Sequence, residues 1–465
     1  MHIHIVGIAG TMTAPLAVSL KNQGHTVTGS DQEKVFPPVS TILQKAHINI
    51  NSTSIDNNID LAIIGSSFKS FSKTRQEFEQ VKQLNIPFVS ATEYIAHNLC
   101  KNESILVAGT YGKTTITSLL TWILKNANFN PSFMFGGESL NDIPSLSFSN
   151  SSWSVTEADE SINGLDSKAK FLYYPLKHLL VTSADWEHRE SYKTKAENLS
   201  AFINLVKKVP KDGLIVLDAK GQNTLELSRF SKSKTVFYNS PQSGYFIKEV
   251  SKKANYNKIK LATPFTDLSL KTPIFGLFNY ENILAAVTMA LNLGIEPTAL
   301  EKAIFEYRGI KRRLELLHTQ NNIHFFDDFA QSPPRIKAVL ESLSREFPSQ
   351  NIFVYYEPHA SFILDKNNLE NFNQAFSPAS RVIVGKINFS NKISKSNRTT
   401  GSLIEKNIGP KSEYLPLPND VLNYFTNNLK PNDIFIHMSS GGLTGINTVN
   451  QIINYFRKNN VKIHS

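Results

Sequence analysis

Short apolar runs alternate with helix-like stretches along most of the chain. The runs are bounded by the Gly, Asp and Ser residues typical of turns, which predicts buried parallel strands. The predicted strands are His4–Val6, Thr26–Thr28, Leu61–Ile64, Pro87–Val89, Ser104–Ala108, Trp153–Thr156, His178–Thr182, Gly213–Leu217, Ile323–Phe326, Ile352–Tyr355, Arg381–Val384 and Asp433–His437. Strands that alternate with helices indicate doubly wound α/β architecture. We expect three such domains, at residues 1–100, 101–309 and 310–465.

The composition fits a multidomain globular protein and excludes several other classes. A chain of 465 residues is too long for one core and suggests roughly three domains. Hydrophobic residues make up 41% and charged residues 19% of the chain, which excludes a disordered protein. The single cysteine, Cys100, excludes an internal disulfide framework and a thiolate cluster for a structural metal.

The chain carries a formal net charge of +10, but its basic residues are spread along the sequence. A nucleic-acid-binding surface would gather them with aromatic residues on one element. We therefore interpret the charge as solvated surface residues that attract anionic ligands, and expect no nucleic-acid partner. The first residues lack a basic targeting segment, and no apolar stretch is long enough to cross a bilayer. We expect a cytoplasmic protein without membrane insertion.

The most informative segment reads Gly109-Thr110-Tyr111-Gly112-Lys113-Thr114-Thr115 and lies between an apolar strand and a predicted helix. Its glycines allow a tight turn whose N–H groups point at phosphate oxygens, assisted by the helix N-terminus. In such a loop Lys113 neutralises the β- and γ-phosphates and the Thr114 hydroxyl ligates Mg²⁺. Val107 stands where the strict pattern has glycine, so this is a variant loop. A plain Gly-rich turn is the alternative, but the position directly after a strand favours nucleotide binding.

A second, weaker glycine pattern follows the first predicted strand. It contains Gly7, Gly10, Thr11 and Met12, and the acidic residue Asp31 lies about 20 residues further on, as in dinucleotide-binding folds. Alone, this pattern would suggest NAD, and Asp31 could merely cap a turn.

The phosphate loop resembles the Gly-Thr-x-Gly-Lys-Thr-Thr of the Mur ligases, which build the peptide stem of peptidoglycan. Further segments resemble motifs of that family in the order that the family has them. They are Glu157-Ala158-Asp159-Glu160, Glu187-His188, Gly276-Leu277-Phe278-Asn279-Tyr280-Glu281-Asn282, Lys311-Arg312-Arg313-Leu314-Glu315 and Asp327-Asp328-Phe329-Ala330-Gln331-Ser332-Pro333. Motifs in one order over much of the chain are far more specific than any single one.

The resemblance implies a role for each matched position. The implied catalytic residues are Lys113, Glu157 and His188, and the implied Mg²⁺ ligands are Thr114, Glu157 and His188. The implied ATP contacts are Gly109, Thr110, Gly112, Lys113, Thr114, Thr115, Asn279, Asn282, Arg313 and Asp328. In Mur ligases the N-terminal fold holds the UDP part of the substrate, which implies UDP-sugar contacts at Gly7, Gly10, Thr11, Met12 and Asp31. The plainer alternatives are a helix cap for Glu157, an exposed loop for His188, a surface helix for Arg313 and an exposed helix face for Asn279 and Asn282.

The resemblance also implies the fold and the reaction. A central P-loop ATPase-like domain would lie between an N-terminal and a C-terminal Rossmann-like α/β domain. The enzyme would use ATP and Mg²⁺ to phosphorylate the carboxylate of UDP-N-acetylmuramate, and an amine would then attack the acyl phosphate.

The expected amine depends on the subgroup within the family. Residues Phe36–Thr41 resemble the murein peptide ligases of peptidoglycan recycling, which implies the tripeptide L-alanyl-γ-D-glutamyl-meso-diaminopimelate. A ligase for L-alanine is an alternative. A catalytically degenerate nucleotide-binding protein is another, because Tyr111, Phe278 and Gln331 replace histidines of the family.

Overall fold

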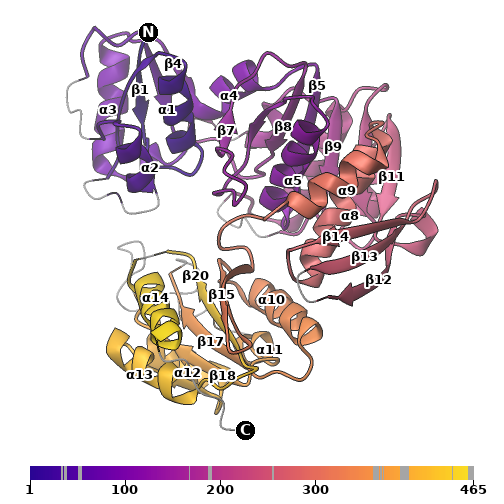
Figure 1. Cartoon of the computed structure of the whole chain (residues 1–465). Helices are drawn as coiled ribbons and strands as arrows, with labels where there is room; N and C mark the ends of the chain where they lie inside the picture. The colour runs from indigo at the N-terminus through magenta and orange to yellow at the C-terminus, as the bar shows by residue number, and fades with distance from the viewer. Residues whose placement is uncertain are drawn as a thin grey trace. The chain divides into compact units, whose positions relative to one another are not determined.

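A computed structural model of the chain describes residues 1–32, 35, 39–50, 55–166, 168–186, 191–253, 256–359, 366, 369, 371–387, 397–441 and 443–458. The chain forms two compact units (Figure 1). The first unit comprises Met1–Pro273 and Asn279–Ile310, and the second comprises Ile274–Phe278 and Lys311–Ser465. No helix within the described ranges is long and apolar enough to cross a membrane.

The first unit begins with a parallel four-stranded sheet in the order β2-β1-β3-β4. Its strands are β1 (His2–Val6), β2 (Thr26–Ser30), β3 (Leu61–Ile64) and β4 (Phe88–Ser90). Its helices are α1 (Thr13–Asn22), α2 (Val39–Lys45), α3 (Ser72–Gln83) and α4 (Ala91–Leu99), with a short 3₁₀ turn η1 (Phe68–Ser70). Ile3 and Ile5 of β1 pack with α1 and α4, whereas Val6 packs with α3. The period-two alternation of strand side chains therefore supplies both faces of this sheet.

A seven-stranded sheet follows, in the order β11-β10-β9-β5-β8-β6-β7, and only the β6–β7 pair is antiparallel. Its strands are β5 (Glu103–Ala108), β6 (Ser132–Met134), β7 (Leu146–Ser147), β8 (Trp153–Glu157), β9 (His178–Val181), β10 (Leu214–Asp218) and β11 (Lys234–Tyr238). The helices of this region are α5 (Lys113–Asn126), α6 (Lys195–Lys208), α7 (Thr224–Ser228), α8 (Leu277–Asn292) and α9 (Pro297–Glu306). The residues Ser104–Ala108 of β5 are all buried, as expected for a central strand of a parallel sheet covered on both faces.

A small antiparallel sheet, β12-β13-β14, extends the first unit. Its strands are β12 (Phe246–Lys252), β13 (Asn257–Ala262) and β14 (Leu268–Thr272). In β13 and β14 buried and exposed residues alternate, so one face packs against the unit and the other faces solvent.

The second unit contains a six-stranded sheet in the order β15-β16-β20-β17-β18-β19. Its strands are β15 (Glu315–Gln320), β16 (Ile323–Asp328), β17 (Ile352–Glu357), β18 (Arg381–Val384), β19 (Ser412–Tyr414) and β20 (Ile434–Ser439). Only β15 runs antiparallel to its neighbour. β20 therefore lies between β16 and β17, and the carboxyl ends of these three strands meet at one edge.

Helices cover both faces of this second sheet (Figure 1). They are α10 (Pro333–Glu346), α11 (Phe372–Ala375), α12 (Gly401–Ile408), α13 (Pro418–Asn428) and α14 (Leu443–Lys458). Phe326 and Val354 pack with α10–α12, and their chain neighbours Phe325 and Phe353 pack with α13 and α14. The core of the unit is thus two apolar layers separated by the sheet.

The α/β fold class predicted from the sequence is confirmed. Each strand predicted from the sequence coincides with a strand of the structure to within about two residues at either end, as assignment methods themselves differ. The strands β6, β7, β11, β15 and β19 and the antiparallel strands β12–β14 were not among the predicted strands.

Helix α4 ends the first sheet and leads into β5, and its start is fixed by a capping box. The Ser90 side chain accepts from the backbone N–H of Glu93, and the Glu93 carboxylate accepts from the N–H of Ser90. We expect Ser90→Ala to lower the free energy of unfolding by about 1 kcal/mol, the usual cost of losing such a cap. Urea unfolding measures this loss. His97→Ala, an exposed site on the same helix, should change stability by less than about 0.5 kcal/mol, and an equal loss in both variants would contradict the role of the cap.

Candidate active site

The phosphate loop predicted from the sequence connects β5 to α5 in the first unit. Gly112 precedes the first residue of α5 and has a φ of 78°, which a residue with a Cβ adopts only at a cost. A Cβ on Gly112 would also collide with the Oδ1 of Asn282. The glycine is therefore required both by the turn and by the side chain packed over it.

The Lys113 ammonium folds back over this loop. Its Nζ donates to the carbonyl oxygen of Gly109 at 2.6 Å and lies 2.8 Å from Oε2 of Glu160. Burial alone would lower the pKa of Lys113, but its attraction to Glu160 and Glu157 holds that pKa above its ordinary value. Lys113 is therefore a fixed cation at the N-terminus of α5.

Thr114 and Glu157 face each other beside this lysine. The Thr114 hydroxyl donates to the Glu157 carboxylate, with Oγ1 at 3.0 Å from Oε1 and 2.9 Å from Oε2. The N–H of Gly136 donates to the same carboxylate at 2.7 Å. Glu157 ends β8, the strand beside β5, so neighbouring strands place the two oxygen ligands predicted for Mg²⁺ side by side.

The remaining loop residues are held by the protein itself. The Thr110 hydroxyl accepts from the N–H of Asp185 at 3.0 Å, and the Thr182 hydroxyl donates to the carbonyl of Tyr111 at 2.7 Å. The Thr115 carbonyl accepts from the Tyr307 hydroxyl at 3.3 Å. These contacts hold the loop in shape at the N-terminus of α5.

Asn282 lies against Gly112 of this loop, and Asn279 lies beside Asn282. The sequence had suggested both residues as ATP contacts. They occupy one face of α8, and the Asn282 Nδ2 donates to Oδ1 of Asn279 at 3.5 Å. Both residues are buried, which excludes the exposed helix face that was the alternative.

The N-terminal glycine pattern forms a second loop in the first unit, after β1. The N–H groups of Gly7 and Ile8 donate to the carbonyl of Ser30 at 2.8 Å and 3.0 Å. The Asp31 carboxylate accepts from the N–H of Ala9 at 2.8 Å. Gly10 donates to the hydroxyl of Thr13 at 3.0 Å. Asp31 thus shapes the glycine loop, whatever ligand that loop takes.

Thr11 and Met12 complete that loop. They directly precede α1, and Thr11 is exposed while Met12 is half-buried. Their N–H groups stand at the N-terminus of a helix, where anions are stabilised.

Arg313 and Asp328 lie together in the second unit. The Asp328 carboxylate accepts from the N–H groups of Leu314 and Ala330, each at 2.7 Å. Burial raises the pKa of Asp328 to about 6, against the opposing attraction of Arg313. The Arg313 guanidinium carbon lies 5.3 Å from the centre of the Phe329 ring.

Gln331 has a structural role in this unit that its sequence did not indicate. Its Nε2 donates to the carbonyls of Glu357 and Met438 at 3.2 Å and 3.5 Å. Its Oε1 accepts from the N–H of His359 at 2.9 Å. Gln331 therefore bridges the carboxyl ends of β17 and β20, which explains a buried amide where the family motif has histidine.

Glu187 and His188, together with Phe36–Pro38, lie outside the described residues, so the third ligand predicted for Mg²⁺ has no structural description. Among the described residues no group of three or more His, Cys, Asp and Glu side chains could hold a metal ion. The Thr114 and Glu157 oxygens nonetheless suit Mg²⁺, which commonly takes one or two protein oxygens together with substrate phosphates.

The structure places four residues to which the sequence assigned no role in buried ion pairs: Glu160, Asp327, Glu357 and His437. Glu160 pairs with Lys113, and it could have been noticed as the last residue of the matched Glu-Ala-Asp-Glu segment. His437 lies between two carboxylates, with Nδ1 at 2.8 Å from Asp327 and Nε2 at 3.1 Å from Glu357. Asp327 and His437 are 110 positions apart, so no local pattern could have linked them.

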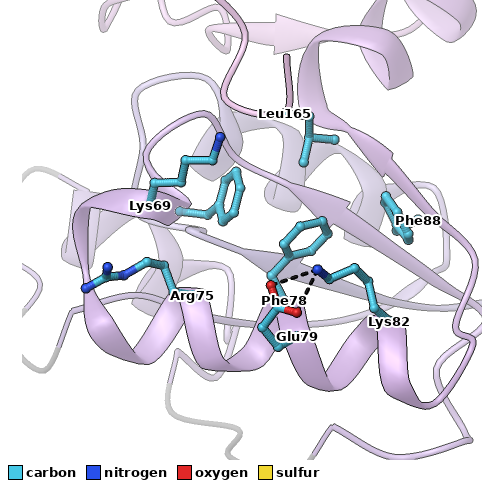
Figure 2. Close-up of a pocket in the computed structure, with 8 residues that line it drawn as sticks. Lys69, Arg75, Phe78, Glu79, Lys82, Phe88 and Leu165 are labelled. Atoms are coloured by element: carbon cyan, nitrogen blue, oxygen red, sulfur yellow. Dashed lines mark hydrogen bonds and ion pairs between the residues drawn. The ribbon is translucent and has the colours of Figure 1, made fainter.

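The structure also has a surface pocket of about 650 Å³ beside α3 and η1 (Figure 2). Three phenylalanines and Leu165 form its apolar lining, and an ion pair of 2.6 Å joins two of its other lining residues, Lys82 and Glu79. None of the predicted site residues lines it; the lining residues are Phe68, Lys69, Arg75, Phe78, Glu79, Lys82, Phe88 and Leu165.

Two family models match most of the first unit of the chain. Residues 2–102 match the model described as "Mur ligase family, catalytic domain", and residues 107–290 match "Mur ligase middle domain". The UDP-N-acetylmuramate–L-alanyl-γ-D-glutamyl-meso-2,6-diaminoheptandioate ligase of Escherichia coli is 30% identical over 352 residues, 74% of this chain and 75% of that protein. The chain belongs to the Mur ligase family.

Two further relatives carry the name of another member of the family. The UDP-N-acetylmuramate–L-alanine ligase of Pelagibacter ubique is 29% identical over 391 residues, 82% of each chain. The crystal structure of the UDP-N-acetylmuramate–alanine ligase of Thermotoga maritima superposes with a TM-score of 0.79, at 23% identity over 98% of this chain and 99% of that one. The three-domain α/β fold is thus shared over the whole length.

Members of the Mur ligase family are ATP-dependent, ADP-forming amide ligases that use Mg²⁺. This Mur ligase is therefore an enzyme of that class, and the phosphate loop is the part of it in which nucleotide chemistry is expected.

We expect Lys113→Ala to abolish ADP release, because the loop loses the cation that offsets the γ-phosphate charge. Since this change leaves Glu160 buried without its ion-pair partner, the double variant Lys113→Ala/Glu160→Gln is the matched control for folding. Lys125→Ala, in the last turn of the same helix, should keep wild-type turnover. Full activity in the Lys113 variants would remove the loop from the mechanism.

The His437 ion pairs predict a pH-dependent stability of the second unit. Burial alone would lower the pKa of His437, but its hydrogen bonds to Asp327 and Glu357 raise that pKa above 6.5. Because the pKa of His437 is higher in the folded than in the unfolded state, its ion pairs stabilise the fold fully at a pH below the unfolded-state pKa. This stabilisation is lost as the pH rises through the folded-state pKa. We expect the thermal midpoint of the second unit to fall as pH rises above about 6.5, with a shallower fall in His437→Gln. His97→Gln, at an exposed site, should keep the wild-type slope; equal slopes in all three proteins would contradict the account.

Proposed function

We propose that this Mur ligase joins the carboxylate of UDP-N-acetylmuramate to the amine of L-alanine, with cleavage of ATP to ADP and phosphate. The observation that carries the proposal is the phosphate loop with its paired Lys113–Glu160 and Thr114–Glu157 side chains. The two relatives compared above by sequence are both named for UDP-N-acetylmuramate as substrate. L-alanine is favoured because the Pelagibacter ubique ligase named for it matches 82% of this chain, against 74% for the Escherichia coli tripeptide ligase.

The first step requires an anionic carboxylate to attack an anionic triphosphate. The carboxylate oxygen forms a bond to the γ-phosphorus while the bond to the β,γ-bridging oxygen breaks, which gives an acyl phosphate and ADP. Lys113 would offset the repulsion by pairing with the phosphate oxygens. Thr114 and Glu157, with His188 as the further candidate, would hold Mg²⁺, which when bound neutralises phosphate charge.

Lys113 would exchange one anionic partner for another when ATP binds. Its ion pair with Glu160 already holds the ammonium at the loop, so a phosphate oxygen would replace a carboxylate oxygen at the same cation. The lysine therefore needs little rearrangement, and less side-chain entropy is lost on binding.

The second step is attack of the amine on the acyl phosphate. The amine nitrogen bonds to the carbonyl carbon, and the tetrahedral intermediate collapses. Phosphate leaves with the original carboxylate oxygen, and the proton lost by the amine nitrogen passes to the departing phosphate. The loop N–H groups that held the triphosphate would stabilise the departing phosphate.

The other predicted residues would position the two nucleotides. Asn279 and Asn282, buried beside Gly112, would contact the adenine. Arg313 would contact the nucleotide and Asp328 the ATP ribose. The UDP-sugar would be held by Gly7, Gly10, Thr11, Met12 and Asp31.

The murein tripeptide is the second candidate for the amine. It is favoured by the 30% identity to the Escherichia coli tripeptide ligase and by the resemblance at residues 36–41. In that case the enzyme would serve peptidoglycan recycling rather than the first step of stem synthesis.

ADP release from purified protein with ATP, Mg²⁺ and UDP-N-acetylmuramate separates these candidates. We expect release with L-alanine to exceed release with L-alanyl-γ-D-glutamyl-meso-diaminopimelate by at least about tenfold in kcat/KM, a difference of about 1.4 kcal/mol in transition-state binding. The reverse order would establish the tripeptide ligase. ATP binding without acceptor-dependent release for any amine would contradict both candidates and favour a degenerate nucleotide-binding protein.

A further inference from the structure

A chain of buried charges crosses the carboxyl edge of the sheet in the second unit. His437 of β20 contacts Asp327 of β16 and Glu357 of β17, and all three side chains are at most 2% exposed. Asp327 continues the chain, since its Oδ2 lies 3.2 Å from Nε of Arg312. An imidazole, two buried carboxylates and a partly exposed guanidinium therefore form one continuous network of contacts.

The outer end of this network is Arg312, in the segment that precedes β15. Its guanidinium donates to the carbonyl of Ser439, at the end of β20. The backbone N–H of Arg312 donates to the Glu315 carboxylate at 2.8 Å, and the backbone carbonyl of Arg312 accepts from the N–H of Phe329 at 2.9 Å. Arg312 has a φ of 60°, a strained conformation that the surrounding bonds must maintain.

The Phe329 ring lies against both arginines of this segment. The guanidinium carbons of Arg312 and Arg313 each lie 5.3 Å from the ring centre, within the range of cation–π attraction. The backbone N–H of the next residue, Leu314, is held by Asp328. Two contacts thus set the position of Arg313. Its side chain lies against the Phe329 ring, which Arg312 also contacts, and its backbone is held next to the Leu314 N–H that Asp328 accepts from.

The inner end of the network is closely packed. Gly445 of α14 lies against Glu357, where a Cβ would collide with Oε2 of that carboxylate. The other Glu357 oxygen accepts from the Tyr355 hydroxyl at 3.0 Å. The contact with Glu357 therefore holds the His437 ring in place from the β17 side, and the ring in turn holds Asp327.

A purely structural role is the competing interpretation of these contacts. Buried ion pairs cost desolvation free energy, and apolar residues of similar volume often replace them without loss of stability. Apolar packing would not fix the orientation of these side chains. Here both imidazole nitrogens and both carboxylates make directional contacts, which do fix it.

We propose that His437 is a positioning residue for the nucleotide: through Asp327 it fixes Arg312, and through Arg312 and Phe329 it holds Arg313 in place. The inference rests on the proposed function, in which Arg313 contacts ATP. His437 itself touches no substrate in this scheme.

Calorimetric titration of the full chain with Mg²⁺ and a non-hydrolysable ATP analogue tests the proposal without depending on the amine. Arg313→Ala should weaken the Kd about tenfold, the size of one charged hydrogen bond. His437→Gln and Arg312→Gln should each weaken it by a similar factor. Because the two residues act in series, their double variant should be no weaker than the weaker single variant within about twofold. His324→Gln, in the same unit, is the control and should keep the wild-type Kd.

The possible outcomes separate the two claims. A wild-type Kd in His437→Gln alongside a weakened Arg313→Ala would overturn the positioning role, even if the thermal midpoint of His437→Gln falls. Additive losses of about a hundredfold in the double variant would overturn the serial route. An unchanged Kd in Arg313→Ala would refute the proposed contact and the inference with it. Should His437→Gln fail to fold, His437→Gln/Glu357→Gln, which removes one charge of each sign, is measured in its place.

Discussion

The pairing of the buried Lys113 ammonium is the interaction on which the site depends. A buried ammonium without an anionic partner loses its hydration, and no electrostatic interaction offsets the free energy of that desolvation. Here Glu160 and the carbonyl of Gly109 supply the partners, so the cation remains charged at the N-terminus of α5. A site that holds a fixed cation beside a helix N-terminus is already complementary to phosphate.

That arrangement follows from the topology of the central sheet. β5 and β8 are adjacent and parallel, so the loop after β5 and the carboxylate ending β8 emerge at the same edge. The helix α8 then brings Asn282 against Gly112. Three segments far apart in the sequence meet there because the sheet order places their ends together, as in other α/β proteins.

The sequence predicted those parts that depend on local chemistry. The central parallel strands of both large sheets were visible as apolar runs, whereas β6, β7, β11, β15 and β19 were not predicted. The loop with Lys113 and Thr114 was visible because glycine, lysine and threonine occupy fixed positions between a strand and a helix. Asn279 and Asn282 were recognised from their spacing and the family motif. The roles assigned to these residues, and the domain boundaries, remain predictions.

Other parts could not be predicted, because they depend on contacts between distant segments. His437 reads as one residue of an apolar strand, and only the pairing of β16 with β20 brings it to Asp327. The role of Gln331 depends on the ends of β17 and β20 in the same way. The alternation of β12–β14 is short and weak beside the long apolar runs, which is why the small antiparallel sheet was missed.

The central claim is that a carboxylate of the sugar nucleotide is phosphorylated at the Lys113 loop before the amine attacks. Mass spectrometry of the phosphate released from ATP and UDP-N-acetylmuramate labelled with ¹⁸O in its carboxylate tests this most directly. The account predicts that each released phosphate carries one labelled oxygen from the acid. Amide product formed together with unlabelled phosphate would contradict it.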